Sequence, residues 1–345
     1  MHTGELEAAA AHAEEGAELS RQLAERPALE RSERPSMLVG IMGLSASWRV
    51  GNKALEIQCL TYLALIRIFQ GRLQEGVAIA RGVWATSREL PERMEPMSLW
   101  VLGTGLQEVG EYEEALVLAR RGTELARKVR DAFLLAIHLV RLGDAHVALL
   151  NLEEARGAYE EAVGLGHNEA VSSARLCILA VLSEDWEDAH AHAKSAHEDG
   201  TFFNPLLSVH LHHEVEALVW GGDERLAREE AYRLAERTQM DERNRVAYLH
   251  SLAVLSEWEG ELERAISQMR EAEALTERIG LPGELWPIRA KIGELHERRG
   301  EVGEAKKAFS RATQTLRDLA AKIKDEGLRE GFLLAPRVRR VLGYR

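Results

Sequence analysis

The stretch Gly260–Ala265, which reads Gly-Glu-Leu-Glu-Arg-Ala, is one of seven related turns that decide the fold. The other copies share its length and its small final residue, and they end at Gly76, Ala115, Ala155, Ala189, Ala227 and Ala305. Successive final residues are 39, 40, 34, 38, 38 and 40 positions apart. A period of this size fits one helix pair per copy, whereas a propeller blade would need four alternating strands. The turns therefore predict an all-α solenoid of stacked antiparallel helix hairpins.

Each turn combines a residue that ends one helix with residues that start the next. Glycine reaches the left-handed conformation at little cost, and acidic residues suit the positive N-terminus of a helix. Pro91, Pro96, Pro205 and Pro282 fall between hairpins or in the first turn of a helix, where a missing amide proton costs little. We expect no proline deep inside a helix.

The composition excludes several classes of protein. The 345 residues include 44 basic and 56 acidic side chains, and 46% of the chain is hydrophobic. No apolar run is long enough to cross a bilayer and the start lacks a secretory pattern, so we expect a cytoplasmic protein. The net charge of −12 argues against direct binding to nucleic acid. The arginine-rich tail, with Arg337, Arg339, Arg340 and Arg345, is expected to be solvated.

The residues around the turns resemble the tetratricopeptide repeat (TPR). The third copy has Leu139, Leu142-Gly143, His146, Ala155 and Tyr159 where that pattern has a large residue, Leu-Gly, an aromatic, an alanine and another aromatic. The copies depart from it in length and in several aromatic positions. Their longer helices resemble the TPR regions of bacterial signal-transduction ATPases and large LuxR-type activators. The resemblance implies a right-handed superhelix whose first helices line the concave side.

Three parts of the chain are expected. Residues 53–324 form seven TPR-like hairpins. Residues 1–52 hold a partial repeat, which opens inside a second helix, and an irregular segment with a short helix near residues 37–48. Residues 325–345 form a cap, which buries Leu328, Phe332 and Leu333, followed by the basic tail. We expect the protein to be mostly monomeric.

Aligning the copies selects the side chains that face the concave groove. These are Trp100, Thr104, Glu108, Asp144, His212, Glu216, Trp220, His250, Trp258 and Glu294, with Glu297 one turn further on. Tryptophans, histidines and acids together suit a protein or peptide ligand, in particular a segment with positive and apolar residues. The alternative for Trp220 and Trp258 is that both are packed between hairpins.

Histidines gather on two neighbouring helices: His190, His192 and His197 on one, and His210, His212 and His213 on the next. Such pairs could hold zinc or sense pH. However, no cysteine or fixed carboxylate completes a ligand set, so no metal is expected.

No catalytic motif occurs in the sequence. The chain has no phosphate-binding loop, and the stretch 213–217 begins like a zinc-protease helix but lacks the second histidine. We therefore expect neither enzyme activity nor a cofactor. The sequence favours a scaffold that binds a protein or peptide. The alternative is the ligand-sensing arm of a larger bacterial transcription regulator or signalling ATPase, with a small-molecule effector.

Overall fold

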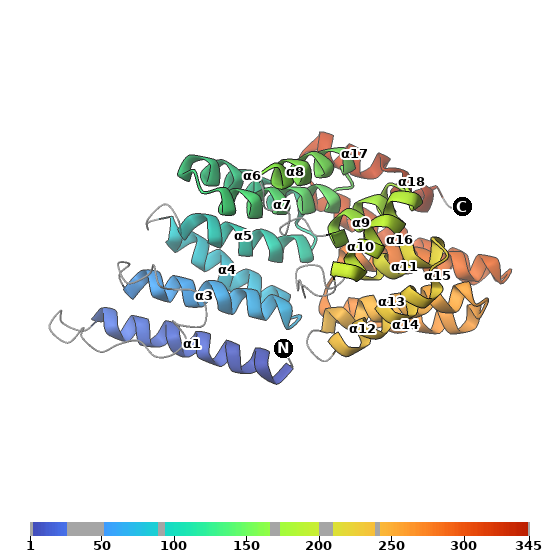
Figure 1. The fold of residues 1–345 in the computed structure, drawn as a ribbon, viewed down its shortest axis with the longest axis horizontal. Helices are drawn as coiled ribbons and strands as arrows, with labels where there is room; N and C mark the ends of the chain where they lie inside the picture. The colour runs from blue at the N-terminus through green and yellow to red at the C-terminus, as the bar shows by residue number, and fades with distance from the viewer. Residues whose placement is uncertain are drawn as a thin grey trace.

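The computed structural model describes residues 3–25, 52–88, 94–165, 173–199, 210–238 and 242–343 (Figure 1). The described residues form helices and no strand. The hairpins are α3 (Asn52–Phe69) with α4 (Leu73–Ser87), α5 (Met94–Glu108) with α6 (Tyr112–Val129), α7 (Ala132–Ala148) with α8 (Leu152–Gly164), α9 (Ser173–Leu182) with α10 (Trp186–Asp199), α11 (His212–Trp220) with α12 (Glu224–Arg237), α13 (Glu242–Trp258) with α14 (Leu262–Ile279), and α15 (Pro282–Arg298) with α16 (Val302–Lys322).

Helix α1 (Thr3–Glu25) precedes these pairs, and the short helices α17 (Glu326–Leu334) and α18 (Pro336–Leu342) follow them. The structure is a right-handed superhelical solenoid of stacked antiparallel hairpins, as the period predicts. The helix expected near residues 37–48 lies outside the described residues. None of the described helices is both long and apolar enough to cross a membrane.

The predicted turn geometry is confirmed. Left-handed backbone, with φ between 74° and 83°, occurs at Gly71, Gly110, Gly222, Gly260 and Gly300. Where two copies lack glycine, Leu150 and Glu184 adopt the same conformation, with φ of 59° and 60°. The hairpin geometry therefore imposes this conformation even on residues that disfavour it.

The expectation that no proline lies inside a helix is wrong at Pro287. This residue lies in α15, five positions after Pro282 at the start of that helix. A proline there cannot donate to the carbonyl of Gly283, so one helical hydrogen bond is lost. Both Gly283 and Pro287 line the cavity described below, so the hydrogen bond is lost on the side of this continuous helix that faces open space.

Small and aromatic residues of the TPR-like pattern pack against each other within a hairpin. A Cβ atom added to Gly143 would lie 2.3 Å from the ring of Tyr159, and one added to Gly293 would lie 2.7 Å from the ring of Phe309. Both pairs are separated by 16 residues. The close approach of the two helices therefore depends on the absence of a side chain at the glycine.

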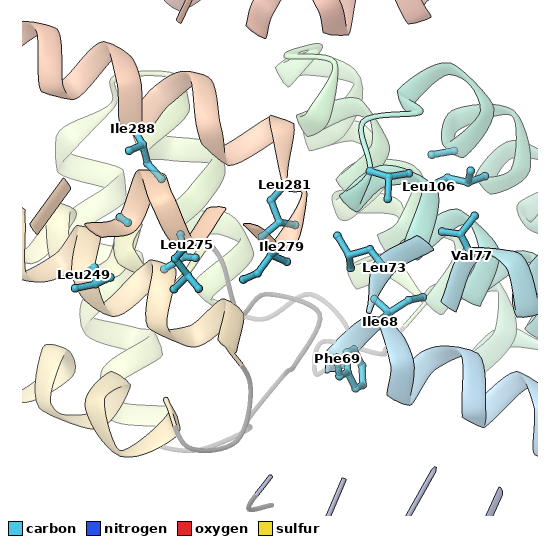
Figure 2. Packing of buried hydrophobic residues seen from close by; sticks show 14 of the residues in the cluster. Ile68, Phe69, Leu73, Val77, Leu106, Leu249, Leu275, Ile279, Leu281 and Ile288 are labelled. Atoms are coloured by element: carbon cyan, nitrogen blue, oxygen red, sulfur yellow. The ribbon is translucent and has the colours of Figure 1, made fainter. Parts of the chain in front are cut away.

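The superhelix brings its early hairpins against its late ones. Ile68 and Leu73 of the first hairpin share one hydrophobic cluster with Ile279 and Leu281 of the last two hairpins (Figure 2). We call the superhelix that is closed by this contact the ring, and its early and late hairpins the two sides of the ring. Lys322 Nζ donates to the Val109 carbonyl at 2.9 Å, 213 residues away along the chain. The concave side is consequently enclosed rather than open along its length.

The C-terminal cap is close to its prediction. Phe332 is 1% exposed, and Leu328 and Leu333 are partly buried against the same cluster. The aromatic ring of Phe332 also lies 6.3 Å from that of Tyr112. The cap therefore takes part in the contact between early and late hairpins.

The basic tail differs from its expectation of full solvation. Val338 and Val341 are buried in α18, which holds the segment against the solenoid. Arg337 is half-buried, and Arg340 pairs with Glu184. Arg345 lies outside the described residues. The apolar spacing of Val338 and Val341 explains why this segment is helical rather than solvated.

Candidate functional site

The concave side encloses a cavity of about 560 Å³. Its walls come from both sides of the ring, from the end of α5 and start of α6 to α15, α17 and α18. The first helices α9, α11 and α13 supply much of the rest. The cavity therefore lies between early and late hairpins of the superhelix.

A row of histidines forms one wall. The rings of His212 and His250 stack with their centroids 3.8 Å apart, and that of His213 is 4.0 Å from His212. His210 stacks on His213 at 6.5 Å. Burial, and then the neighbouring imidazoles of His212 and His213, hold the pKa of His250 well below its ordinary value. His250 is therefore a neutral ring at neutral pH.

Carboxylates face these histidines. Glu216 lies 3.4 Å from His213, and Glu284 lies 3.2 Å from His210. Burial works to raise the pKa of Glu216, but the hydrogen bond and charge of His213 outweigh it and lower that pKa to about 2. The same opposition, with His210 as partner, lowers the pKa of Glu284. Both carboxylates are therefore ionised at neutral pH.

Glu108 joins the cavity to the contact between the two sides of the ring. It lies 3.1 Å from Arg243, whose guanidinium is fully buried and also lies 5.2 Å from the centroid of Phe69. This carboxylate therefore lines the cavity and, at the same time, balances a buried charge.

The part of the wall that α15 and α18 supply carries mixed charges. Lys291 lies 2.7 Å from Glu257 and 3.6 Å from Glu294, and Glu294 is 55% exposed. Arg337 and Arg340 reach the cavity from α18. The cavity thus carries buried carboxylates paired with histidines in its depth and exposed charged side chains, such as Glu294 and Arg340, at its mouth.

The structure brings six of the ten predicted groove residues together around this cavity: Glu108, His212, Glu216, Trp220, His250 and Glu294. Trp258 lies next to them, with its ring 6.2 Å from that of Trp220. Trp220 and Trp258 are 55% and 47% exposed, so neither is enclosed between hairpins.

Three predicted groove residues lie elsewhere. Trp100 is partly buried against the hydrophobic cluster, and the buried Thr104 donates its hydroxyl hydrogen to the Trp100 carbonyl at 2.9 Å. Asp144 is buried between Arg141 and Arg175. The side chains that the register selected on the second and third hairpins thus pack inside the solenoid wall, apart from Glu108.

Sequence reasoning missed several residues of the cavity, among them Glu284, Lys291, Arg337 and Phe332. Arg337 and Phe332 follow the last repeat, so no register places them in the groove. Glu284 lies in the first turn of α15, where acidic residues are common for another reason, the helix dipole.

The two groups of histidines are separate. His190 lies 2.6 Å from Asp223, the residue before α12, and His197 lies 3.2 Å from Glu230 of α12. His192 lies 3.4 Å from Asp188 of its own helix, whereas His210, His212 and His213 face the cavity. Among the residues that the structure describes, no three histidine, cysteine or acidic side chains are arranged to hold a metal ion.

Comparison with known proteins supports the fold. No protein-family model and no curated protein sequence matches the chain. Among solved structures, the chain is similar to the Rap conjugation gene regulator of the plasmid pLS20 in complex with the Phr* peptide, with a TM-score of 0.64 and 12% identity over 84% of this chain and 81% of that one. It is also similar to a chain of the APC/C hetero-tetramer Cut9-Hcn1, with a TM-score of 0.51 and 15% identity over 88% of this chain and 57% of that one. These two structures support a TPR-like helical repeat fold for the chain.

Proposed function

We propose that the protein binds a short peptide segment, as a free peptide or as part of a protein, inside the closed superhelix. The observation that carries this proposal is the cavity of about 560 Å³ on the concave side. Its volume falls within the range of about 300 to 1,000 Å³ that is usual for ligand pockets. The structure of the pLS20 regulator, whose fold is similar, is of a complex with the Phr* peptide, which supports the same kind of ligand here.

The lining favours a segment with basic and apolar residues. Six glutamates line the cavity (Glu108, Glu184, Glu216, Glu284, Glu294 and Glu297) against one lysine and two arginines (Lys291, Arg337 and Arg340). Aromatic surfaces of Trp186, Trp220 and Trp286 supply apolar contact. A ligand with positive charge gains from the excess of carboxylates, and its apolar side chains gain from the tryptophans.

The test is a peptide-display selection on the purified chain, followed by isothermal titration of the selected peptides. Basic peptides with aromatic or aliphatic residues should be enriched. Glu294→Lys and Glu297→Lys change exposed residues of α15 at the cavity and should weaken binding at least tenfold. Glu160→Lys makes the same change on the exposed surface of α8 and should leave binding unchanged. Enrichment of acidic peptides, or equal binding by all three variants, would refute the proposal.

The cavity volume also suits a small-molecule effector, which fits the alternative of a sensing arm within a larger regulator or signalling ATPase. Native mass spectrometry of the chain purified from its source distinguishes the ligands, because a retained small molecule has a defined mass and a peptide fragments into residues. The likeness to LuxR-type activators remains a prediction from the sequence. In both cases we propose a binding protein in the cytoplasm, mostly monomeric, rather than an enzyme or a nucleic-acid-binding protein.

A further inference from the structure

Three tryptophans from consecutive hairpins lie side by side on the surface. The ring centroids of Trp186 and Trp220 are 5.9 Å apart, and those of Trp220 and Trp258 are 6.2 Å apart. The rings are 37%, 55% and 47% exposed, in that order. Tryptophan is usually highly buried, so three half-exposed rings in contact form an unusual surface. We call Trp186, Trp220 and Trp258 the tryptophan cluster.

The repeat places this cluster at the mouth of the cavity. Trp220 and Trp258 end the first helices α11 and α13, each seven residues before the small residue of the following turn. Trp186 begins α10 after the preceding turn. Trp186 and Trp220 also line the cavity. A ligand that extends out of the cavity on this side therefore passes over the cluster.

The rings are held at an angle to one another. The planes of Trp186 and Trp220 differ by 47°, and those of Trp220 and Trp258 by 81°. Tilted aromatic walls of this kind can surround a cation, which is attracted to a ring within about 6 Å of its centroid. Because neighbouring centroids are about that far apart, one cation can reach two rings.

The charges around the cluster favour a cationic occupant. Asp185 and Glu187 flank Trp186 and are exposed, and Glu259 follows Trp258. The chain's own Arg228 pairs with Glu224 and Glu259, at 2.8 Å and 2.5 Å. Among the described residues, the cations found over aromatic rings are Arg88 on Trp84 and Arg243 on Phe69, so the tryptophan cluster has none over its faces.

We infer that the tryptophan cluster receives an arginine or lysine side chain of the peptide that occupies the cavity. This inference rests on the proposed function and names the part of the ligand that lies at the mouth. The cation lies against the exposed surfaces of two adjoining indoles and near the carboxylates of α10 and α12. The cluster thereby selects for a basic residue next to the segment that enters the cavity.

The test uses a small probe, so that it does not depend on the display selection. The chain is labelled with 5-fluorotryptophan, and each fluorine signal is assigned with a single Trp→Phe variant. N-acetyl-arginine amide should shift the signals of Trp186, Trp220 and Trp258 saturably. N-acetyl-citrulline amide has nearly the same shape without the charge and should bind at least about threefold more weakly. Trp84, whose ring already carries Arg88, is the internal control and should not shift.

Equal shifts by the two probes, or no shift with either, would overturn the inference. So would a shift of the same three signals by a maltooligosaccharide but not by the arginine probe, because a sugar would then be the occupant. Trp220→Leu and Trp258→Leu should lower the affinity of selected basic peptides about fivefold and leave their stoichiometry unchanged. If these variants bind like wild type while Glu294→Lys does not, the role of the tryptophan cluster is refuted and the proposal of peptide binding in the cavity is retained.

Discussion

Two groups of buried polar side chains come from first helices of neighbouring hairpins. On α7 and α9, Asp144 accepts hydrogen bonds from Tyr159 at 2.5 Å and from Arg175 at 3.0 Å, and it pairs with Arg141. On α11 and α13, His212 and His250 stack and face open space. The sequence places Asp144, His212 and His250 on the same concave face, yet only the histidines lie at the cavity.

The difference lies in whether the partners of each group are inside the chain. Asp144 is surrounded by donors that satisfy both of its oxygens, so it has little left for a ligand. The histidine wall instead borders a cavity, and among the described residues the buried Nδ1 of His250 has no hydrogen-bond partner. A buried polar group that is complete serves the fold, and one that borders a cavity is available for binding.

The largest effect is expected from Asp144→Asn. The substitution keeps the shape of the side chain but leaves Arg141 and Arg175 buried without their counter-charge, and removing one partner of a buried ion pair costs about 3 to 5 kcal/mol. Urea unfolding at pH 7 measures the change. Glu161→Gln, which removes an exposed partner of Arg127, should cost less than about 1 kcal/mol. A similar small loss of stability for both variants would show that Arg141 and Arg175 do not depend on the charge of Asp144.

The next largest effect is a pH dependence at His138, which lies beside the Asp144 group. Burial, and to a smaller extent the charge of Arg141, lower the pKa of His138 from 6.5 to about 4, although a contact with the Pro96 carbonyl works in the opposite direction. As the pH falls below 6.5, the unfolded chain takes up this proton before the folded chain does. Stability is therefore full above 6.5 and is lost progressively down to pH 4.

Between pH 7 and pH 5 this loss should amount to about 2 kcal/mol. It is measured as the difference between wild type and His138→Gln in urea unfolding at the two pH values. The variant should lose less stability than wild type over this interval. If wild type and His138→Gln lost the same stability between the two pH values, the imidazole of His138 would be solvated. His138 would then not belong to the buried polar group around Asp144.

A smaller difference, between two glycine variants, is expected where the early and late hairpins meet. Gly110 and Gly260 both have left-handed backbone, with φ of 79° and 81°. A Cβ atom at Gly110 would lie 2.6 Å from Leu319 and 2.9 Å from Pro282, whereas none of the surrounding atoms is within 4 Å at Gly260. Gly260→Ala should cost about 1 kcal/mol for its backbone alone. Gly110→Ala should cost about 1 to 2 kcal/mol more, because it forces the two sides of the ring apart.

Thermal or urea unfolding gives both values. Ligand binding gives a second readout, because only the substitution at Gly110 should enlarge the cavity. Equal costs for the two variants would mean that the two sides of the ring separate without loss, and the cavity would be an open groove.

The sequence predicted the local parts of this structure well. The turn that begins at Gly260 and the contact between Gly143 and Tyr159 depend on residues that are close in the chain, and similar residues recur at these positions in several copies. The closure of the ring could not be predicted in this way. The contact between Lys322 and Val109 depends on the sum of small rotations over several hairpins, and no single copy carries that information.

The site was predictable to a similar extent. Register alone selected His212, Glu216 and His250, because each occupies a first helix on the side where the cavity lies. It selected Asp144 for the same reason, and it failed there because Arg175 of the following hairpin occupies the space that a ligand would need. Which groove residues face a cavity is therefore decided by the side chains of the next repeat.

The smallest effect on stability is expected from Arg340→Ala. Arg340 pairs with Glu184 at the cavity, and both side chains are about half exposed. Exposed ion pairs contribute about 0.2 to 1 kcal/mol, so the fold should be almost unchanged. The pair nevertheless joins α18 to the turn before α10, and its loss should let a basic peptide enter faster.

Arg127→Ala removes an ion pair of similar exposure, with Glu161, that does not line the cavity. Stopped-flow association of a selected peptide should accelerate severalfold for Arg340→Ala and not for Arg127→Ala. Equal rates would show that the peptide enters elsewhere, and the mouth of the cavity would have to be sought away from α18.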